Sequence, residues 1–202
     1  MEKVNIAVMV SGGGTNLQAL IDAQESGIIK SGAIQLVISN NAEAFALERA
    51  KKAGIKTATV LKKDCATQEI FEDKIIKTLE ENGIDLIILA GFMSILSERF
   101  TSHFEKRIIN VHPSLIPSFC GEGFYGLKVH KAALEKGVKV TGATVHFVNE
   151  IPDGGEIIMQ RAVEVMEGDT PETLQKRVMC QAEWKILPLS AEKICKEIMG
   201  EK

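Results

Sequence analysis

The feature that most constrains this fold is the alternation, over the first half of the chain, of short apolar runs with amphipathic segments. The apolar runs predict strands at residues 6–10, 34–39, 57–61, 86–90 and 108–111. Between them, residues 17–23, 44–53 and 70–79 carry apolar side chains at i, i+3 and i+4, as helices do. Each of these segments is followed by a glycine that can end a helix: Gly27, Gly54 and Gly83. This order is typical of βα units on a mainly parallel sheet.

The character of the sequence changes after His112. Residues 111–126, VHPSLIPSFCGEGFYG, follow neither period and predict an ordered surface loop. Beyond them we expect a helix at 129–136, strands at 139–148 and 156–165, and a last helix at 171–199 with a candidate break at Pro188. The predicted fold is α/β and Rossmann-like: a doubly wound, mainly parallel sheet flanked by helices, with an antiparallel extension in the C-terminal part. Because 202 residues with 45% hydrophobic content can bury one core, we expect a single domain over 1–202.

Charge and composition exclude several classes of function. A net charge of −3 offers no basic footprint, so we expect neither nucleic acid nor a membrane as partner. The first apolar run reaches Gly12 too early to be a signal sequence or a membrane span, and we expect a cytoplasmic protein. The 4 cysteines show no CxxC spacing and no HExxH is present, which predicts reduced thiols and no metal site.

A glycine-rich turn, Ser11 to Asn16, connects the first predicted strand to the first predicted helix. Its glycines let backbone N–H groups point at an anion beside the N-terminus of the helix, which makes the turn a candidate phosphate cradle. The GK[ST] of a P-loop is missing, and Leu17 replaces the third glycine of GxGxxG, so a triphosphate or dinucleotide is disfavoured. A plain tight turn in which Thr15 or Asn16 caps the helix explains the same residues equally well.

Polar side chains gather where the strand at 108–111 ends. Asn110 and His112 lie two positions apart and therefore share one face, at the edge of a parallel sheet where sites form. An amide donor can hold the oxyanion of an acyl-transfer intermediate, and an imidazole can move the proton. A loop histidine bonded to the backbone is the alternative for His112.

Asp153 occupies a Pro-Asp-Gly-Gly turn, where local capping of the backbone is its ordinary role. Only contact with His112 would make it functional. The remaining histidines have simpler interpretations: His103 lies in a short polar stretch, His130 on a predicted helix, and His146 in a strand as either a core residue or a partner of the site.

Five segments, in order and with similar spacing, resemble the phosphoribosylglycinamide formyltransferase family: VMVSGGGTNLQALIDA, LAGFMSILS, IINVHPSLIPSF, VTGATVHFVNEIPDGGEIIMQ and EWKILP. The HPSLIP element is shared more widely among folate-dependent formyltransferases and hydrolases. The resemblance implies direct transfer of a formyl group from 10-formyltetrahydrofolate to the amine of 5-phosphoribosylglycinamide in de novo purine biosynthesis. It implies small-molecule substrates and no metal, and we expect a monomer or weak homodimer.

The same resemblance assigns residues. It implies that Asn110, His112 and Asp153 are catalytic. It places the acceptor phosphate on Gly14, Thr15 and Asn16 and the rest of the acceptor on Glu183, so that the N-terminal half binds phosphate while the C-terminal half binds folate and carries catalysis. The folate is expected against Met93, Ser94, Ile95, Leu96, Asn110, Asn149, Glu150, Ile151, Pro152 and Asp153.

Two departures from the family pattern lie near these residues. Ser94 and Gln68 stand where many members carry arginines close to the folate, which predicts a weaker grip on its glutamate tail or a different folate preference. Residues 120–126, CGEGFYG, replace a shorter Pro-Gly turn. One hypothesis is a mobile lid that uses Phe124 and Tyr125 with glycine hinges at Gly121, Gly123 and Gly126; the other is a neutral surface insertion.

Rival functions are a formyltetrahydrofolate hydrolase, a methionyl-tRNA formyltransferase and a non-catalytic sugar-phosphate binding module. The hydrolase shares the Asn, His and Asp set but usually has a regulatory domain, for which there is no room before the first strand. The tRNA enzyme would be expected to carry a C-terminal RNA-binding domain. The proton-handling set of Asn110, His112 and Asp153 argues against a pure binding module.

Overall fold

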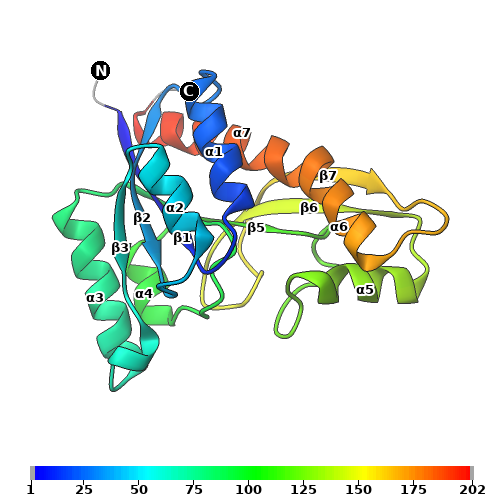
Figure 1. Cartoon of the computed structure of the whole chain (residues 1–202), viewed down its shortest axis with the longest axis horizontal. Helices are drawn as coiled ribbons and strands as arrows, with labels where there is room; N and C mark the ends of the chain where they lie inside the picture. The colour runs from blue at the N-terminus through cyan, green and yellow to red at the C-terminus, as the bar shows by residue number, and fades with distance from the viewer. Residues whose placement is uncertain (1–2, 201–202) are drawn as a thin grey trace.

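The computed structural model of the chain describes residues 3–200. Its strands form one 7-stranded sheet in the order β3-β2-β1-β4-β5-β6-β7 (Figure 1). The pairs from β3 to β5 are parallel, whereas β5–β6 and β6–β7 are antiparallel. The strands are β1 (Val4–Val10), β2 (Gly32–Ser39), β3 (Lys56–Thr59), β4 (Leu86–Leu89), β5 (Ile108–His112), β6 (Val140–Phe147) and β7 (Ile157–Glu164). The predicted doubly wound sheet and its antiparallel extension are confirmed.

Helices cover both faces of this sheet because β1 is apolar on both. Along it Ile6, Val8 and Val10 pack into one core cluster with α1, α2 and α7, whereas Ala7 and Met9 pack into a second with α3 and α4, as the two-residue period of a strand requires (Figure 1). The helices are α1 (Thr15–Glu25), α2 (Phe45–Lys52), α3 (Gln68–Glu81), α4 (Glu98–His103), α5 (Leu127–Lys136), α6 (Pro171–Val178) and α7 (Trp184–Ile198).

Two short helices were not predicted, a 3-10 helix at Lys62–Asp64 and the α-helix α4. Ser97 caps the short helix α4: its hydroxyl accepts a hydrogen bond from the N–H of Phe100, and the helix buries Phe100 against α3. Its charged residues and His103 are exposed, whereas Thr101 is buried with Phe100, and His103 contacts Glu80 at 2.9 Å. A helix this short shows too few turns to reveal a period, so it resembled a polar loop in the sequence.

The predicted break at Pro188 is wrong. Pro188 lies inside α7, and the irregularity falls earlier, in a π-helical segment at Met179–Glu183 between α6 and α7. The wider turn changes the hydrogen-bond register just before Pro188, so the helix continues through a residue that has no N–H to donate. A π-helical segment in this position often marks a functional residue, and here it ends at the buried Glu183.

Candidate active site

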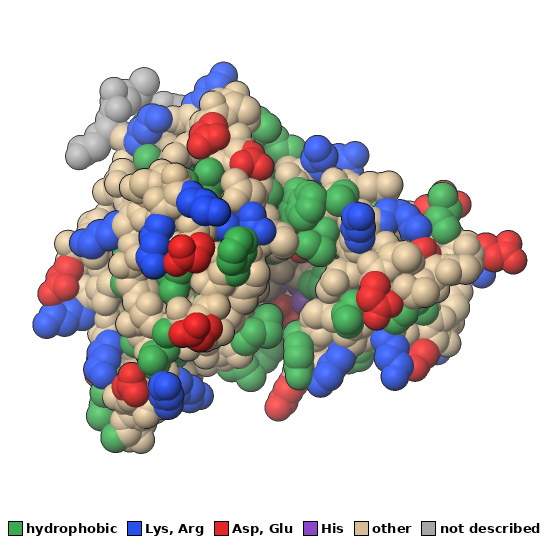
Figure 2. Space-filling view, in the orientation of Figure 1, with side chains coloured by type: hydrophobic (Ala, Val, Ile, Leu, Met, Phe, Trp, Pro, Cys, Tyr) green, Lys and Arg blue, Asp and Glu red, His purple; other side chains and the backbone are tan. Residues whose placement is uncertain are grey.

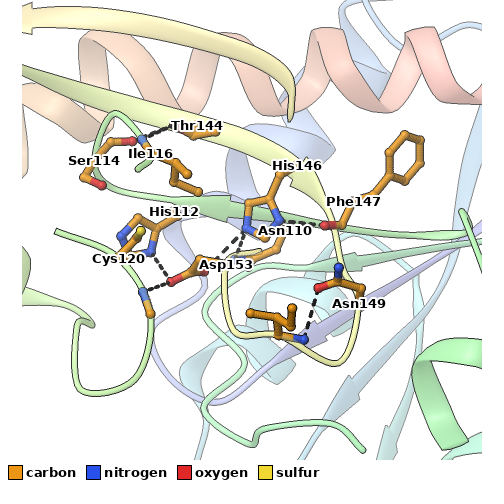
Figure 3. Close-up of polar contacts among 12 residues, drawn as sticks. Asn110, His112, Ser114, Ile116, Cys120, Thr144, His146, Phe147, Asn149 and Asp153 are labelled. Atoms are coloured by element: carbon orange, nitrogen blue, oxygen red, sulfur yellow. Dashed lines mark hydrogen bonds and ion pairs between the residues drawn. The ribbon is translucent and has the colours of Figure 1, made fainter. Parts of the chain in front are cut away.

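A cluster of polar side chains meets at the end of β5 and β6. Asn110 on β5 is the register partner of His146 on β6, and His112 lies two positions further along β5. Asp153 reaches them from the β6–β7 loop, and Figure 3 shows these four side chains converging. The loop lies close against β6, since a Cβ on Gly155 would come within 1.8 Å of the Phe147 carbonyl oxygen. Close packing therefore fixes the position of Asp153.

Asp153 lies between the two histidines. His112 Nδ1 is 3.3 Å from its Oδ2, and His146 Nε2 is 3.4 Å from its Oδ1. His146 Nε2 also lies 3.2 Å from Asn110 Nδ2. Both histidines are buried, with exposed fractions of 4% and 2%, so their polar atoms interact chiefly with one another and with the backbone. The contact that the sequence could not supply, between His112 and Asp153, is present.

Two backbone carbonyls fix protons on the histidines. His112 Nε2 lies 2.9 Å from Phe119 O, and His146 Nδ1 lies 2.7 Å from Phe147 O. A carbonyl oxygen can only accept a hydrogen bond, so each of these nitrogens carries hydrogen. The second nitrogen of His112, Nδ1, faces Asp153, where an additional proton would complete an ion pair, whereas that of His146 is near both Asp153 and Asn110 Nδ2. The cluster can therefore take up and release a proton beside a carboxylate.

Burial and charge act in opposite directions on the two catalytic candidates. Burial lowers the pKa of His112, and the nearby Asp153 carboxylate offsets only part of that shift. Burial alone would raise the pKa of Asp153, but the hydrogen bond from His146, the charge on His112 and the Gly121 N–H together hold it below its ordinary value. The two shifts favour an ionised Asp153 beside a neutral His112, a carboxylate and an imidazole in contact, as acid–base chemistry uses them.

The loop of residues 120–126 touches this cluster directly. The N–H of Gly121 donates to Asp153 Oδ2 at 2.9 Å, and the rings of Phe119 and Phe124 pack edge to face, 6.4 Å apart. Phe119 and Asp153 have left-handed backbone angles, φ 51° and φ 57°, which are strained for residues other than glycine and gather at functional sites. The loop is therefore part of the wall of the site.

A pocket of about 130 Å³ opens beside Asn110 and His146. Figure 2 shows a hollow on this side of the molecule, between the parts that carry α2 and α5, with a histidine side chain inside it and hydrophobic side chains at its rim. Of the residues predicted to contact a folate, the pocket is lined by Ser94, Ile95, Leu96, Asn110, Asn149, Glu150, Ile151, Pro152 and Asp153. Met93 does not line the pocket; it is 59% exposed, and its N–H donates to Ser11 Oγ at 2.8 Å.

The glycine turn and Glu183 form a second polar group. Asn16 Nδ2 donates to Glu183 Oε2 at 2.8 Å, and Asn16 Oδ1 is buried with no hydrogen-bond partner among residues 3–200. The N-cap of α1 is Gly14, φ 70°, and no side chain caps the helix, so the alternative in which Thr15 or Asn16 caps it is wrong. The first N–H groups of α1 are left available to an anion.

Comparison with known proteins identifies the relatives of this chain. Residues 4–190 match the family described as formyl transferase. The chain is 43% identical to phosphoribosylglycinamide formyltransferase of Escherichia coli, over 92% of this chain and 84% of that protein. It is 46% identical to the human trifunctional purine biosynthetic protein adenosine-3, over 95% of this chain but only 18% of that longer protein. The crystal structure of glycinamide ribonucleotide transformylase 1 from Symbiobacterium toebii superimposes with a TM-score of 0.90 at 39% identity, covering 96% and 89% of the two chains.

The chain belongs to the formyl transferase family. Within it, the chain groups with the phosphoribosylglycinamide formyltransferases, as the sequence motifs predict. It is an enzyme of formyl transfer in purine biosynthesis, and its fold is that of these relatives. Within residues 3–200, no cluster of metal-ligating side chains is present, and no helix has the length and apolar character to cross a membrane.

Two histidines of this formyltransferase have surroundings that the sequence left open. His146 contacts both Asn110 and Asp153, although it lies in a strand where a core position explained it equally well. His130, on α5, is fully buried, and neither ring nitrogen has a partner within residues 3–200. Burial, with a smaller effect of the charge on His112, lowers the pKa of His130 to about 4. The pairing register of β5 and β6 places His146 beside Asn110, and the sequence of either strand alone does not reveal that register.

Proposed function

We propose that this enzyme transfers the formyl group of 10-formyltetrahydrofolate to the amine of 5-phosphoribosylglycinamide, in de novo purine biosynthesis. The observation that carries the proposal is the convergence of Asn110, His112 and Asp153 beside a pocket, with the glycine turn and Glu183 forming a second polar site. The names of the relatives that match nearly the whole length of the chain support the choice of acceptor. In this proposal residues 1–202 act as a single domain.

The donor occupies the pocket beside Asn110. Its pterin packs on the apolar side chains of Ile95, Leu96 and Ile151, while the backbone of the loop at 149–153 satisfies its polar edge. Met93 contacts the donor only at the exposed rim of this pocket. No metal is needed, because the chemistry requires only hydrogen-bond donors and a proton acceptor.

The acceptor lies between the cluster and the glycine turn. The free N–H groups beside Gly14, Thr15 and Asn16 hold its phosphate, and Glu183 accepts hydrogen bonds from its polar groups. The buried Oδ1 of Asn16 gains a partner in the same step. Binding at the phosphate then fixes the amine, so that binding energy far from the reacting atoms is used for orientation.

The amine attacks the formyl carbon, and a C–N bond forms as the carbonyl electrons move to oxygen. Asn110 Nδ2–H and His112 Nε2–H donate to this oxyanion, the latter in place of Phe119 O. Asp153 stabilises His112 and accepts the proton that the amine loses, through water. Collapse of the intermediate breaks the bond from the carbon to the folate nitrogen, and that nitrogen takes up, through water, the proton that Asp153 received from the amine.

Folate absorbance decides between transfer and its rivals. The purified chain is mixed with 10-formyltetrahydrofolate, with and without 5-phosphoribosylglycinamide, as wild type and as His112→Ala, Asp153→Asn and the control His103→Ala. We expect turnover that requires the ribonucleotide, collapses by about a hundredfold or more in the first two variants and persists in the third. Folate loss without acceptor would identify a hydrolase instead, and no turnover at all would leave a binding module.

A further inference from the structure

Three consecutive carbonyl groups of the glycine turn are held from the same side. Asn41 Nδ2 donates to Ser11 O at 3.2 Å, the N–H of Ala46 donates to Gly12 O at 3.0 Å, and Arg49 Nε donates to Gly13 O at 2.8 Å. Two of these donors belong to α2, and the third lies in the segment that leads into it. The turn is therefore attached along its length to the α2 side of the molecule.

Peptide geometry makes this attachment relevant to anion binding. In a trans peptide the C=O of one residue and the N–H of the next point in opposite directions. Carbonyls that point toward α2 therefore turn the N–H groups of Gly12, Gly13 and Gly14 away from it, and none of these N–H groups donates to another group within residues 3–200. Successive N–H groups that point together in this way form an anion-binding concavity.

Arg49 supplies the only charged donor of the three. Its Nη1 also donates to Gln18 Oε1 at 3.1 Å, and its guanidinium lies over the ring of Phe45, 5.0 Å from the centroid. The side chain is thus fixed at two hydrogen bonds and one stacking contact, with its positive charge beside the turn. A charge-assisted hydrogen bond is stronger than a neutral one, so Arg49 contributes more to holding the turn than the two amide donors do.

Packing leaves the turn little room to adopt another shape. A Cβ on Gly14 would lie 2.6 Å from the Cβ of Ala46 and 3.4 Å from the Cδ of Arg49, and Gly14 has φ 70°. The turn and the first two turns of α2 are therefore in direct contact. Losing the bond from Arg49 would free the Gly13 carbonyl in particular, and that peptide also carries the N–H of Gly14.

We propose that Arg49 is a positioning residue for the acceptor phosphate: it holds the glycine turn in the conformation that presents its N–H groups, and it adds positive charge beside them. This inference rests on the proposed function, since it assigns the turn to the phosphate of the acceptor. Arg49 acts through the turn and not on the reacting carbon. Loss of Arg49 should therefore weaken binding of the acceptor and leave the chemical step and binding of the donor unaffected.

The test compares Arg49→Met and Arg49→Lys with Lys52→Met, which removes an equal charge from the exposed side of the same helix. Binding of ribose 5-phosphate is measured by calorimetry, and KM for each substrate and kcat by folate absorbance. For Arg49→Met we expect the Kd of ribose 5-phosphate and the KM of the acceptor to rise about tenfold to a hundredfold, with kcat and the KM of the donor within about twofold. Arg49→Lys keeps the positive charge but lacks the guanidinium Nε–H that donates to Gly13 O, so we expect an intermediate rise in both constants.

Unchanged binding in both Arg49 variants, or an equal loss in Lys52→Met, would overturn the inference. So would a common fall in kcat, both affinities and unfolding temperature, which is what a purely structural role predicts. Should Arg49→Met fail to fold, Arg49→Lys is judged by the same measurements.

The same measurements separate this inference from the proposed function. Wild-type protein that binds ribose 5-phosphate through Arg49 but transfers no formyl group would reject the proposed function alone. Full transfer that is indifferent to Arg49 would reject this inference alone.

Discussion

Asn16 donates a hydrogen bond of 2.8 Å to Glu183, although 167 positions separate them in the chain. Asn16 lies in the first turn of α1, next to the glycine turn, and Glu183 is the last residue of the π-helical segment before α7. The contact therefore joins the N-terminal and C-terminal parts of the chain. Burial raises the pKa of Glu183 to about 7, and the bond from Asn16 opposes that shift only in part. A buried carboxyl that titrates near neutrality links stability to pH and also suits the recognition of polar groups on the acceptor.

Replacing Glu183 by Gln should stabilise the protein at high pH. The pKa of Glu183 is about 7 in the folded chain and 4.5 when exposed, so its ionisation costs stability as pH rises from about 4.5 to about 7. Glu183→Gln removes this cost, and we expect a gain of up to about 3 kcal/mol at pH 8 and little at pH 4. Denaturant unfolding at the two pH values measures it, and an equal change at both would contradict the assignment. The KM of the acceptor should rise in the same variant.

His130 should produce the opposite pH dependence. Its pKa is about 4 in the folded chain against 6.5 when exposed, so the unfolded chain binds the proton first and stability falls as pH drops from about 6.5 to about 4. His130→Leu, which keeps an apolar side chain of similar size, should remove up to about 3 kcal/mol of that loss. From pH 7.5 to pH 4 the free energy of unfolding of the variant should therefore rise relative to that of wild type by up to about 3 kcal/mol. Parallel pH profiles for the two proteins would show that His130 is not the group responsible.

Much of the fold could be predicted because its signals are local. The two-residue period of β1 and the glycines after α1, α2 and α3 lie within a few residues of the elements that they define, and Gly27, Gly54 and Gly83 all have positive φ. What the sequence did not reveal is either too short for a period, as in α4, or depends on distant packing. The π-helical segment at Met179–Glu183 is of the second kind, because nothing in its sequence marks a change of register.

The candidate site, too, could be predicted from the sequence only where its signals are local. Asn110 and His112 could be paired from strand period alone, since they share a face of β5. The approach of Asp153 to His112 and of Asn16 to Glu183 follows from topology. The family resemblance anticipated the first contact, but it only placed Asn16 and Glu183 on the same acceptor. The sequence did not decide whether His146 is a core residue or a partner of the site, because the pairing register of two antiparallel strands cannot be read from one of them. In the structure that register places His146 beside Asn110. Arg49 has an ordinary helical position, and its role follows only from the carbonyl that it holds.

Deleting residues 122–126 tests the two interpretations of the long loop. Gly121, which precedes the deletion, donates to Asp153 and helps to hold the pKa of that carboxyl low. We therefore expect the deletion to lower kcat about tenfold, because the Gly121 N–H loses its position. A second variant keeps the length but replaces these residues by Gly and Ser, which removes Phe124 and Tyr125. Lost affinity for both substrates in this second variant supports a lid, whereas unchanged turnover and affinity in both variants would mean a neutral insertion.

Introducing arginine at Ser94 should strengthen binding of folates with long glutamate tails. Ser94 lines the pocket and accepts a hydrogen bond from Asn40 at 2.9 Å, whereas Gln68 donates to the buried Glu72 at 2.8 Å. An arginine at position 68 would pair with Glu72, whereas the side chain at position 94 contacts the neutral Asn40 at the pocket wall. We expect Ser94→Arg to lower the KM of a polyglutamyl donor about twofold to fivefold and Gln68→Arg to do so less. The gain should be smaller for the monoglutamyl donor and should fade as ionic strength rises. Ser94→Gln, which is long but neutral, is the matched control, and an equal gain in that variant would mean that size and not charge is responsible.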